Sequence, residues 1–529
     1  MRFLVLSILI FLVKFSLISQ VNFTNSTLPI VVIDTDNIPI PDEPKIMGNM
    51  GIIYNGPGQV NQLTDPFNAY NGYIGIERRG STSAGFPQQS YGLETRLADS
   101  SNLNVSIFGW PADNDFILYA PYNDKSLMRN VLTYHLGNQT GRWAPRTQFC
   151  EVVLNGNYIG VYVLMERIKT NPGRVDINTL NYSDTLDNQL TGGYIVKVDK
   201  TSGGGEIAWT SPYLSQAPGN NSINFQLHDP EIDSIHPLQK AYIQDFITDW
   251  EIALKISSFT NPSIGYKAYI DVTSFIDYFL LTELSKNVDG YRISSFLYKQ
   301  RLSEGGKLVA GPLWDYNIAW GNANYCQGDL TTGWEINFNN ICGGTWQNPF
   351  WWNRLLEDPL YANEVQCRWT ELRQTTFSDS ALAAYIDSTA TYLSEPANRH
   401  YQKWPILGTY VWPNNYIGQT YQEEIFYLKT WIQNRAAWMD VNMFGTCTAN
   451  FEDIANIQIS IVPNPTQNEI YVSGLIGTGE IFILDLSGKI IQTVPYDSGN
   501  LSIELQQVQN GVYFLSEPNL GIHEKVIKQ

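Results

Sequence analysis

The stretch NVDGYRISSFLYKQRLSEGGKLVAGPLWDYN, residues 287–317, decides how the middle of the chain is interpreted. It opens with a polar turn that contains Asp289, continues as a strand-like run over 295–298, and ends in an apolar run over 308–314 that stops at Asp315. Two carboxylates therefore stand at consecutive junctions between strand and loop. We predict that Asp289 and Asp315 converge on one site.

That arrangement suits phosphoryl transfer. The reaction asks a protein to hold phosphates, to fix one or two Mg²⁺ ions with carboxylates, and to place a base near the acceptor hydroxyl. Mg²⁺ prefers a few hard oxygen ligands and leaves room for the phosphates. Aspartate in a turn also bonds nearby backbone N–H groups, so a purely structural role for either residue stays open.

Outside this stretch, the predicted secondary structure changes from mainly strands to mainly helices near Pro237. Before it, apolar and alternating runs predict strands, and Asn155-Gly156 predicts a tight hairpin turn because both central residues need positive φ. A single early helix is predicted over 124–136. After Pro237, helical spacing predominates over 238–256, 272–284, 351–373, 379–393 and 420–440. A β-rich half followed by a helical half predicts two lobes with a cleft between them.

Composition bounds the class of protein. A chain of 529 residues is too long to fold around a single hydrophobic core, so two or three domains are expected. Its content of 43% hydrophobic and 16% charged residues indicates a well-packed globular protein. The formal net charge of −18 argues against nucleic-acid binding, because neutralising phosphates requires Lys and Arg.

The first residues predict a cleaved export signal. Arg2 precedes an apolar stretch that Lys14 interrupts, and Ser19 supplies a small residue before Gln20. An uncleaved N-terminal anchor is the alternative. No other segment approaches the roughly 20 apolar residues of a transmembrane span.

Export places the five cysteines in an oxidising compartment. Cys326 and Cys342 lie close together in a loop and are the first candidates for a disulfide. Cys367 and Cys447 form a possible second pair, although sequence cannot fix the connectivity. Cys150 lies in an apolar run and is interpreted as a buried thiol. Five histidines and the absence of a CxxC motif argue against zinc.

The C-terminal region predicts a small β-sandwich, with short strands separated by turn residues from about Phe451 onward. Its ordered pieces are Val462-Pro463-Asn464-Pro465, Ile483-Leu484-Asp485-Leu486-Ser487-Gly488, Asn510-Gly511-Val512-Tyr513-Phe514 and Lys525-Val526-Ile527-Lys528-Gln529. In these pieces the tail resembles the type A sorting domain of the type IX secretion system. The resemblance implies recognition by the export machinery, and hence a secreted or cell-surface protein. An accessory carbohydrate-binding or adhesive sandwich is the alternative.

The body carries a second resemblance. Its ordered pieces are Glu77-Arg78-Arg79-Gly80-Ser81, Asp124-Lys125-Ser126-Leu127-Met128-Arg129-Asn130, Asn155-Gly156-Asn157-Tyr158, Arg174-Val175-Asp176, Asn287-Val288-Asp289-Gly290-Tyr291-Arg292 and Gly311-Pro312-Leu313-Trp314-Asp315-Tyr316-Asn317. Over 70–345 the chain resembles the spore-coat CotH kinase family, an atypical kinase-like group. The resemblance implies an α+β fold: a bilobal kinase-like domain, with a β-rich N-lobe and a helical C-lobe, followed by a small all-β Ig-like sandwich.

The predicted boundaries are 1–19 for the signal peptide, 20–69 for a β-rich segment, 70–447 for the kinase-like domain and 448–529 for the sorting domain. The kinase resemblance implies an enzyme that uses ATP and Mg²⁺ to phosphorylate Ser or Thr of an unknown secreted protein.

The same resemblance assigns roles to single residues. Asp289 takes the catalytic role and Asp315 the metal-binding role, with Asn317 as a further oxygen ligand. Arg79 and Ser81 are predicted to contact the nucleotide phosphates through the guanidinium group and the loop. Arg96 is predicted to serve the nucleotide in place of a lysine.

Other readings stay open. Gln88, Gln89 and Glu94 stand where family members carry a basic pattern, and they favour a catalytically inactive, kinase-like binding or structural protein at the surface. The 15 Trp and 31 Tyr also permit glycan binding. A glycoside hydrolase has no specific support beyond the presence of carboxylates.

Overall fold

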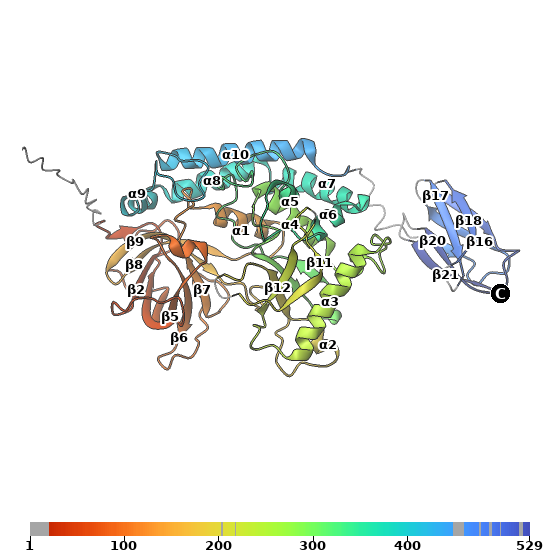
Figure 1. Cartoon of the computed structure of the whole chain (residues 1–529), viewed down its shortest axis with the longest axis horizontal. Coiled ribbons are helices and arrows are strands. Elements are labelled where there is room, and N and C mark those ends of the chain that lie inside the picture. The colour runs from red at the N-terminus through yellow and green to blue at the C-terminus, as the bar shows by residue number, and fades with distance from the viewer. Residues whose placement is uncertain are drawn as a thin grey trace, which may run out of the picture. The chain divides into compact units, whose positions relative to one another are not determined.

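The computed structural model describes residues 21–202, 205–216, 218–447, 460–475, 478–485, 489–497, 499–517 and 522–529. The predicted signal peptide, residues 1–19, lies outside them, as does the predicted start of the sorting domain at 448–459. The chain forms two compact units. Among the described residues, the first unit comprises those within 21–245, 273–353 and 371–443, and the second those within 246–272, 354–370 and 444–529. Figure 1 shows the elements in chain order.

A closed seven-stranded barrel occupies the N-terminal part of the first unit (Figure 1). Its strands, in barrel order, are β2 (Ile30–Asp34), β3 (Ile46–Ile53), β5 (Tyr70–Arg79), β6 (Ser90–Arg96), β7 (Asp115–Tyr119), β9 (Asn157–Glu166) and β8 (Thr147–Leu154). Alternation decides which side chains face inward: Ile74, Ile76 and Leu93 are buried in the barrel core. Their neighbours Glu77, Arg79 and Glu94 consequently lie on the outer face of the same strands.

The hairpin of β8 and β9 confirms the predicted turn, since Asn155 and Gly156 both have positive φ, 49° and 75°. Beyond it, Gly160 has φ of 107°, and a Cβ there would lie 2.9 Å from Trp404 and 3.1 Å from His400. The close approach lets Val161 N–H donate to His400 Nδ1 at 3.1 Å, while Trp404 Nε1 donates to the Ile159 carbonyl. The barrel is thereby joined to the helical region.

A five-stranded antiparallel sheet follows the barrel, in the order β11 (Trp209–Leu214), β12 (Ser222–Asp229), β10 (Tyr194–Val198), β13 (Ser295–Lys299) and β14 (Leu308–Ala310). Two short strands, β1 (Asn25–Ser26) and β4 (Asn61–Gln62), pair separately. The helices are α1 (Arg129–Gln139), α2 (Asp187–Leu190), α3 (Pro237–Lys255), α4 (Val272–Ser285), α5 (Phe338–Ile341), α6 (Trp351–Leu356), α7 (Pro359–Gln374), α8 (Asp379–Tyr392), α9 (Ser394–Lys403) and α10 (Tyr421–Asn442). The mixed α+β class with a β-rich N-terminal region and a helical region is confirmed.

Three helical details differ from the predictions. The helix predicted from 124 begins at Arg129, because the Asp124 carboxylate accepts the N–H groups of Ser126 and Arg129 and holds a turn. The single helix predicted over 351–373 is two, α6 and α7, and the second begins at Pro359, where the missing N–H costs nothing. Helix α9 and the single-turn helices α2 and α5 have no counterpart among the predicted helices.

Both predicted disulfides are confirmed, since Cys326 is bonded to Cys342 and Cys367 to Cys447. Cys150 is buried and outside these bonds, as expected, and burial raises the pKa of its thiol well above the usual value. Among the described helices, none combines the length and apolar character that crossing a membrane requires.

The C-terminal residues form two antiparallel sheets. One contains β15 (Ser460–Val462), β16 (Glu469–Leu475) and β19 (Gly499–Glu504), and the other β18 (Ile490–Tyr496), β17 (Gly479–Leu484), β20 (Gly511–Glu517) and β21 (Ile522–Lys528). Side chains from both sheets, including Val472, Ile483 and Leu515, form one buried cluster. The predicted all-β tail is therefore confirmed as two sheets that share a core.

Candidate functional site

Asp289 lies in the loop between α4 and β13, and its neighbours hold it in place. Its N–H donates to Asn287 Oδ1 at 3.2 Å, and its Oδ1 accepts from Arg292 Nη2 at 2.6 Å. Arg292 is in turn held over the ring of Phe338, with Cζ 4.2 Å from the ring centroid. Within the described part of the chain, Oδ2 of Asp289 has no hydrogen-bond or ion-pair partner. This oxygen can therefore accept a further hydrogen bond.

Asp315 lies in the loop that follows β14. It adopts the left-handed conformation, with φ of 62°, which is uncommon for a residue with a Cβ. Its N–H donates to Tyr134 Oη at 3.1 Å, and its carbonyl accepts from Asn287 Nδ2 at 3.2 Å. Asn287 thus binds both loops at once, Asp289 through its oxygen and Asp315 through its nitrogen. The strained conformation is held by neighbours on both sides.

The carboxylate of Asp315 interacts electrostatically with that of Asp289. Its side chain is reached by solvent, yet protein surrounds it so closely that desolvation raises its pKa to about 6. The charges of Asp289 and Asp199 contribute to the same rise in pKa, while those of Lys200 and Arg79 oppose it. Negative charges therefore accumulate at this point, with two cations within electrostatic reach.

Asp199 was missed by the sequence reasoning. It follows β10, whose last residue Val198 pairs with Ser295 at the start of β13. Its carboxylate accepts from the backbone of Lys200 at 2.9 Å and of Ser294 at 3.3 Å, and it pairs with Lys197 Nζ at 3.1 Å. The signal was available, because an apolar strand that stops at an aspartate is the same pattern that singled out Asp315.

Arg79 and Ser81 lie beside these loops. Arg79 ends β5, and its Cζ is 5.8 Å from the ring centroid of Trp314, the residue before Asp315. Burial, together with the charge of nearby Arg167, lowers the pKa of Arg79 to about 10, and the charge of Asp315 opposes this shift. Ser81 Oγ is 3.0 Å from Ser202 Oγ. The structure therefore brings Arg79 to the Asp315 loop, and Ser81 to the segment that follows Asp199.

Arg96 is placed differently. The register of β5 and β6 sets Arg79 opposite Ser90 and Arg96 opposite Tyr73. Six residues of strand, about 20 Å, separate the two positions along β5. The guanidinium of Arg96 pairs with Glu94 at 2.7 Å, and Lys45 pairs with the same carboxylate at 3.0 Å. Burial alone would raise the pKa of Glu94, but the hydrogen bonds from Arg96 and Lys45 outweigh it and lower that pKa.

Asn317 is buried, and its Nδ2 donates to Asn123 Oδ1 at 3.2 Å. Its backbone carbonyl accepts from Asn322 Nδ2 at 2.8 Å. Asn317 therefore ties the end of the Asp315 loop to the turn before α1. A direct role with a metal stays a prediction.

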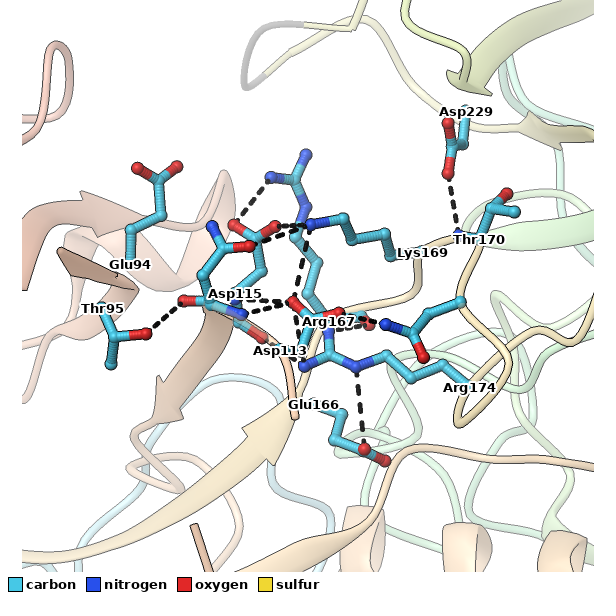
Figure 2. A network of polar contacts seen from close by, with 12 residues as sticks. Glu94, Thr95, Asp113, Asp115, Glu166, Arg167, Lys169, Thr170, Arg174 and Asp229 are labelled. Carbon is cyan, nitrogen blue, oxygen red and sulfur yellow. Dashed lines mark hydrogen bonds and ion pairs between the residues drawn. The ribbon is translucent and has the colours of Figure 1, made fainter. Parts of the chain in front are cut away.

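A charged network lies where β7 and β9 pair, between residues 113–115 and 166–174 (Figure 2). Lys169 Nζ is 2.7 Å from Asp115, Arg167 Nη1 is 3.8 Å from the same carboxylate, and Arg174 Nη2 is 3.5 Å from Asp113. Figure 2 shows Lys169 directed at both Asp113 and Asp115. The sequence reasoning did not single out Arg167 or Lys169, because their importance depends on strands β7 and β9 meeting. Arg167 is paired with Asp115 and also with Glu231, whose carboxylate lies 3.2 Å from its Nη2.

No cluster of three or more His, Cys, Asp or Glu side chains within the described residues is already arranged as a metal-ligand set. The oxygens of Asp289 and Asp315 are nonetheless of the hard type that Mg²⁺ prefers.

Comparison with known proteins identifies the families that the two parts of the chain match. Residues 76–439 match the family described as CotH kinase protein, and residues 460–529 match the secretion system C-terminal sorting domain. The inner spore coat protein H of Bacillus subtilis (strain 168) is 24% identical over 253 residues, which cover 47% of this chain and 59% of that relative. The sorting domain indicates export across the outer membrane, to the cell surface or beyond. The chain belongs to the CotH kinase protein family and ends in a secretion sorting domain.

Proposed function

We propose that the chain is an exported phosphotransferase, which moves a phosphoryl group from ATP to a Ser or Thr hydroxyl of another exported protein. One observation carries the proposal: Asn287 ties the Asp289 loop to the Asp315 loop, where Arg79 and Lys200 act on the Asp315 charge. Carboxylates and cations are thereby gathered as phosphoryl transfer requires.

The residues fit a magnesium–nucleotide complex. Asp315, with Asp199 and the predicted ligand Asn317, would hold the metal, because gathered carboxylates that repel one another are relieved by a divalent cation. Arg79 and Ser81 would contact phosphate oxygens. The bound complex supplies the phosphoryl group and neutralises charge on its oxygens. Asp289, held by Arg292, would accept the proton of the attacking hydroxyl through Oδ2.

We further infer a two-lobed, kinase-like arrangement. The barrel β2–β9 corresponds to the N-lobe, and the five-stranded sheet with its helices corresponds to the C-lobe. The two C-terminal sheets correspond to an Ig-like sandwich. This assignment is supported by the family match over 76–439 and by the shared core of the two tail sheets.

The departures from the family's basic pattern are compatible with activity. Gln88 is buried and donates to the Val161 carbonyl at 2.9 Å, so it supports the barrel. Glu94 is paired with Lys45 and Arg96, which offset the repulsion its charge would exert on a phosphate. The role proposed for Arg96 is therefore to pair with Glu94.

Binding and transfer test the proposal separately. The chain without residues 1–19 is titrated calorimetrically with ATP and Mg²⁺, and transfer of labelled phosphate to extracted surface proteins is then followed. Asp315→Asn should weaken nucleotide affinity by about tenfold or more, or about 1.4 kcal/mol. Asp289→Asn should keep that affinity and slow transfer by about 10²- to 10⁴-fold.

Asp387→Asn is the matched control. Asp387 is an exposed carboxylate on α8 that pairs with Lys429 at 2.7 Å. Its replacement should change neither measurement. If the folded wild type binds no nucleotide at millimolar concentration, the phosphotransferase is excluded and the alternative, an inactive kinase-like binding protein, is favoured.

A further inference from the structure

A strip of aromatic and asparagine side chains lies on the surface of the first unit. It consists of Asn324, Tyr325, Tyr410, Trp412, Asn415, Tyr416 and Tyr427, and is called the aromatic strip below. Tyr410 is 50% exposed and Trp412 is 43% exposed. Tyr and Trp with such exposure present flat faces to solvent, although burial of either ring would be favourable.

The first half of the strip is built by two chain segments that are far apart in sequence. Ala323 and Asn414 form a β-bridge, and Asn324 N–H donates to the Pro413 carbonyl at 2.9 Å. The rings of Tyr325 and Trp412 stack with centroids 5.9 Å apart and planes 10° apart. Asn324 Nδ2 donates to Tyr410 Oη at 3.1 Å. These side chains are therefore ordered before any ligand arrives.

The second half continues onto α10. Asn415 Nδ2 donates to Tyr427 Oη at 3.3 Å, and that hydroxyl donates to the Gly321 carbonyl at 2.9 Å. The rings of Tyr416 and Tyr427 stack almost in parallel, 4.4 Å apart. Aromatic faces fixed in this way lose little conformational entropy on binding.

One end of the strip reaches the candidate catalytic loop. Tyr325 packs against the buried cluster of Val288, Ala323 and Phe338, and Val288 directly precedes Asp289. Burial raises the pKa of the Tyr325 hydroxyl well above its usual value, and the charge of Asp289 raises it further. A molecule lying on the strip would therefore have one end near Asp289.

The chemistry of the strip selects its ligand. All seven side chains are uncharged, so the strip has no ionic group of its own that would pair with a charged ligand. An aromatic face carries negative potential and attracts the polarised C–H groups on one side of a sugar ring. Asparagine amides beside those faces can donate to and accept from hydroxyl groups. The sorting domain indicates export to the cell surface or beyond, so the ligand of the strip is expected among extracellular molecules.

We propose that the aromatic strip binds a neutral glycan. Insofar as the proposed phosphoryl transfer operates, the strip holds the sugar chain of a glycosylated acceptor and brings that acceptor to Asp289. A proline-rich peptide is the competing occupant, since aromatic grooves also bind such segments.

The test is glycan binding by the chain without residues 1–19, measured by calorimetry in the absence of nucleotide. The probes are neutral hexasaccharides of glucose, mannose, xylose and N-acetylglucosamine, together with one decaproline peptide. At least one hexasaccharide should bind, and Trp412→Ala and Tyr410→Ala should each weaken it by about tenfold. Tyr182→Ala is the matched control, because Tyr182 is 61% exposed and outside the strip.

Three results would overturn the proposal: no hexasaccharide binds, a bound hexasaccharide is indifferent to both strip variants, or decaproline is the only probe whose binding the strip variants reduce. Thermal unfolding of each variant establishes that it is folded. Asp289→Asn should retain sugar affinity within about twofold. A failure of the proposed phosphoryl transfer can therefore be distinguished from a failure of the proposed glycan binding.

Discussion

Asp315 combines a left-handed backbone, two neighbouring carboxylates and a raised pKa, so its charged form is disfavoured in the folded state. A carboxyl group whose pKa rises on folding, here from 3.8 to about 6, contributes stability that is fully present below 3.8. That contribution is lost as the pH rises through 6. Asp315→Asn should therefore raise the melting temperature at pH 8, by roughly 2 to 4 °C, with the gain disappearing below pH 4.

Melting temperatures measured without metal or nucleotide from pH 4 to 8 check this prediction. Asp387→Asn, at an exposed carboxylate, should follow the wild type throughout. An advantage of Asp315→Asn that grew toward acid pH would contradict the assigned direction of the pKa shift. The combination of lost nucleotide affinity and gained stability is the behaviour expected of a site whose strain serves a ligand.

Some residues of the candidate site could be predicted from the sequence, and others could not. Asp289 and Asp315 were predicted from strand–loop junctions, and the structure brings them within electrostatic reach. Asn287 could not be assigned its bridging role, because both of its hydrogen bonds depend on how two loops meet. Arg96 was predicted to join Arg79 at the nucleotide, and only the register of β5 and β6 reveals that the two residues lie far apart.

Among the elements, the loop between Cys326 and Cys342 has a specific link to the site. It carries Phe338, over which Arg292 is held, and Arg292 binds the Asp289 carboxylate. Replacing both cysteines by serine removes a closed loop with a sequence separation of 16, which should lower stability by about 3 kcal/mol. It should also loosen Arg292, and so slow phosphoryl transfer while the nucleotide affinity set by Asp315 changes less.

The other disulfide supplies the control. Cys367→Ser with Cys447→Ser removes a bond in the second unit, and should lower the melting temperature without changing the transfer rate of the protein that remains folded. Denaturant unfolding and labelled-phosphate transfer measure the two effects. Equal loss of transfer in both double variants would show that the Cys326–Cys342 loop has no special connection to Asp289.

Elements were predictable where a periodic pattern and a local signal agreed. The β8–β9 hairpin and α4 fall where their patterns placed them, since Asn155-Gly156 and a regular apolar stripe act locally. Helix α9 was not predicted, and its fixing contacts are tertiary: His400 accepts from Val161 of β9. The position of α9 is therefore set by its contacts with the barrel, which the sequence of the helix alone does not reveal.

At the scale of the whole molecule, the fold and the destination are encoded in separate parts of the chain. The kinase family match ends at 439 and the sorting domain match begins at 460. The two disulfides are features suited to an oxidising exterior. Removal of the sorting domain should therefore change where the protein is found rather than what its candidate site binds.

A chain that ends after Cys447 keeps the Cys367–Cys447 bond and lacks the sorting domain. Expressed in a bacterium with a type IX secretion system, it should accumulate in the periplasm, whereas the full chain reaches the surface or the medium. Fractionation and immunoblotting measure the distribution, and nucleotide affinity should stay within about twofold of the full chain. Val526→Asp, which places a charge in the buried core of the two tail sheets, should retain the protein in the same way. Normal export of the truncated chain would mean that the address lies elsewhere, and the tail would then be better explained as an accessory module.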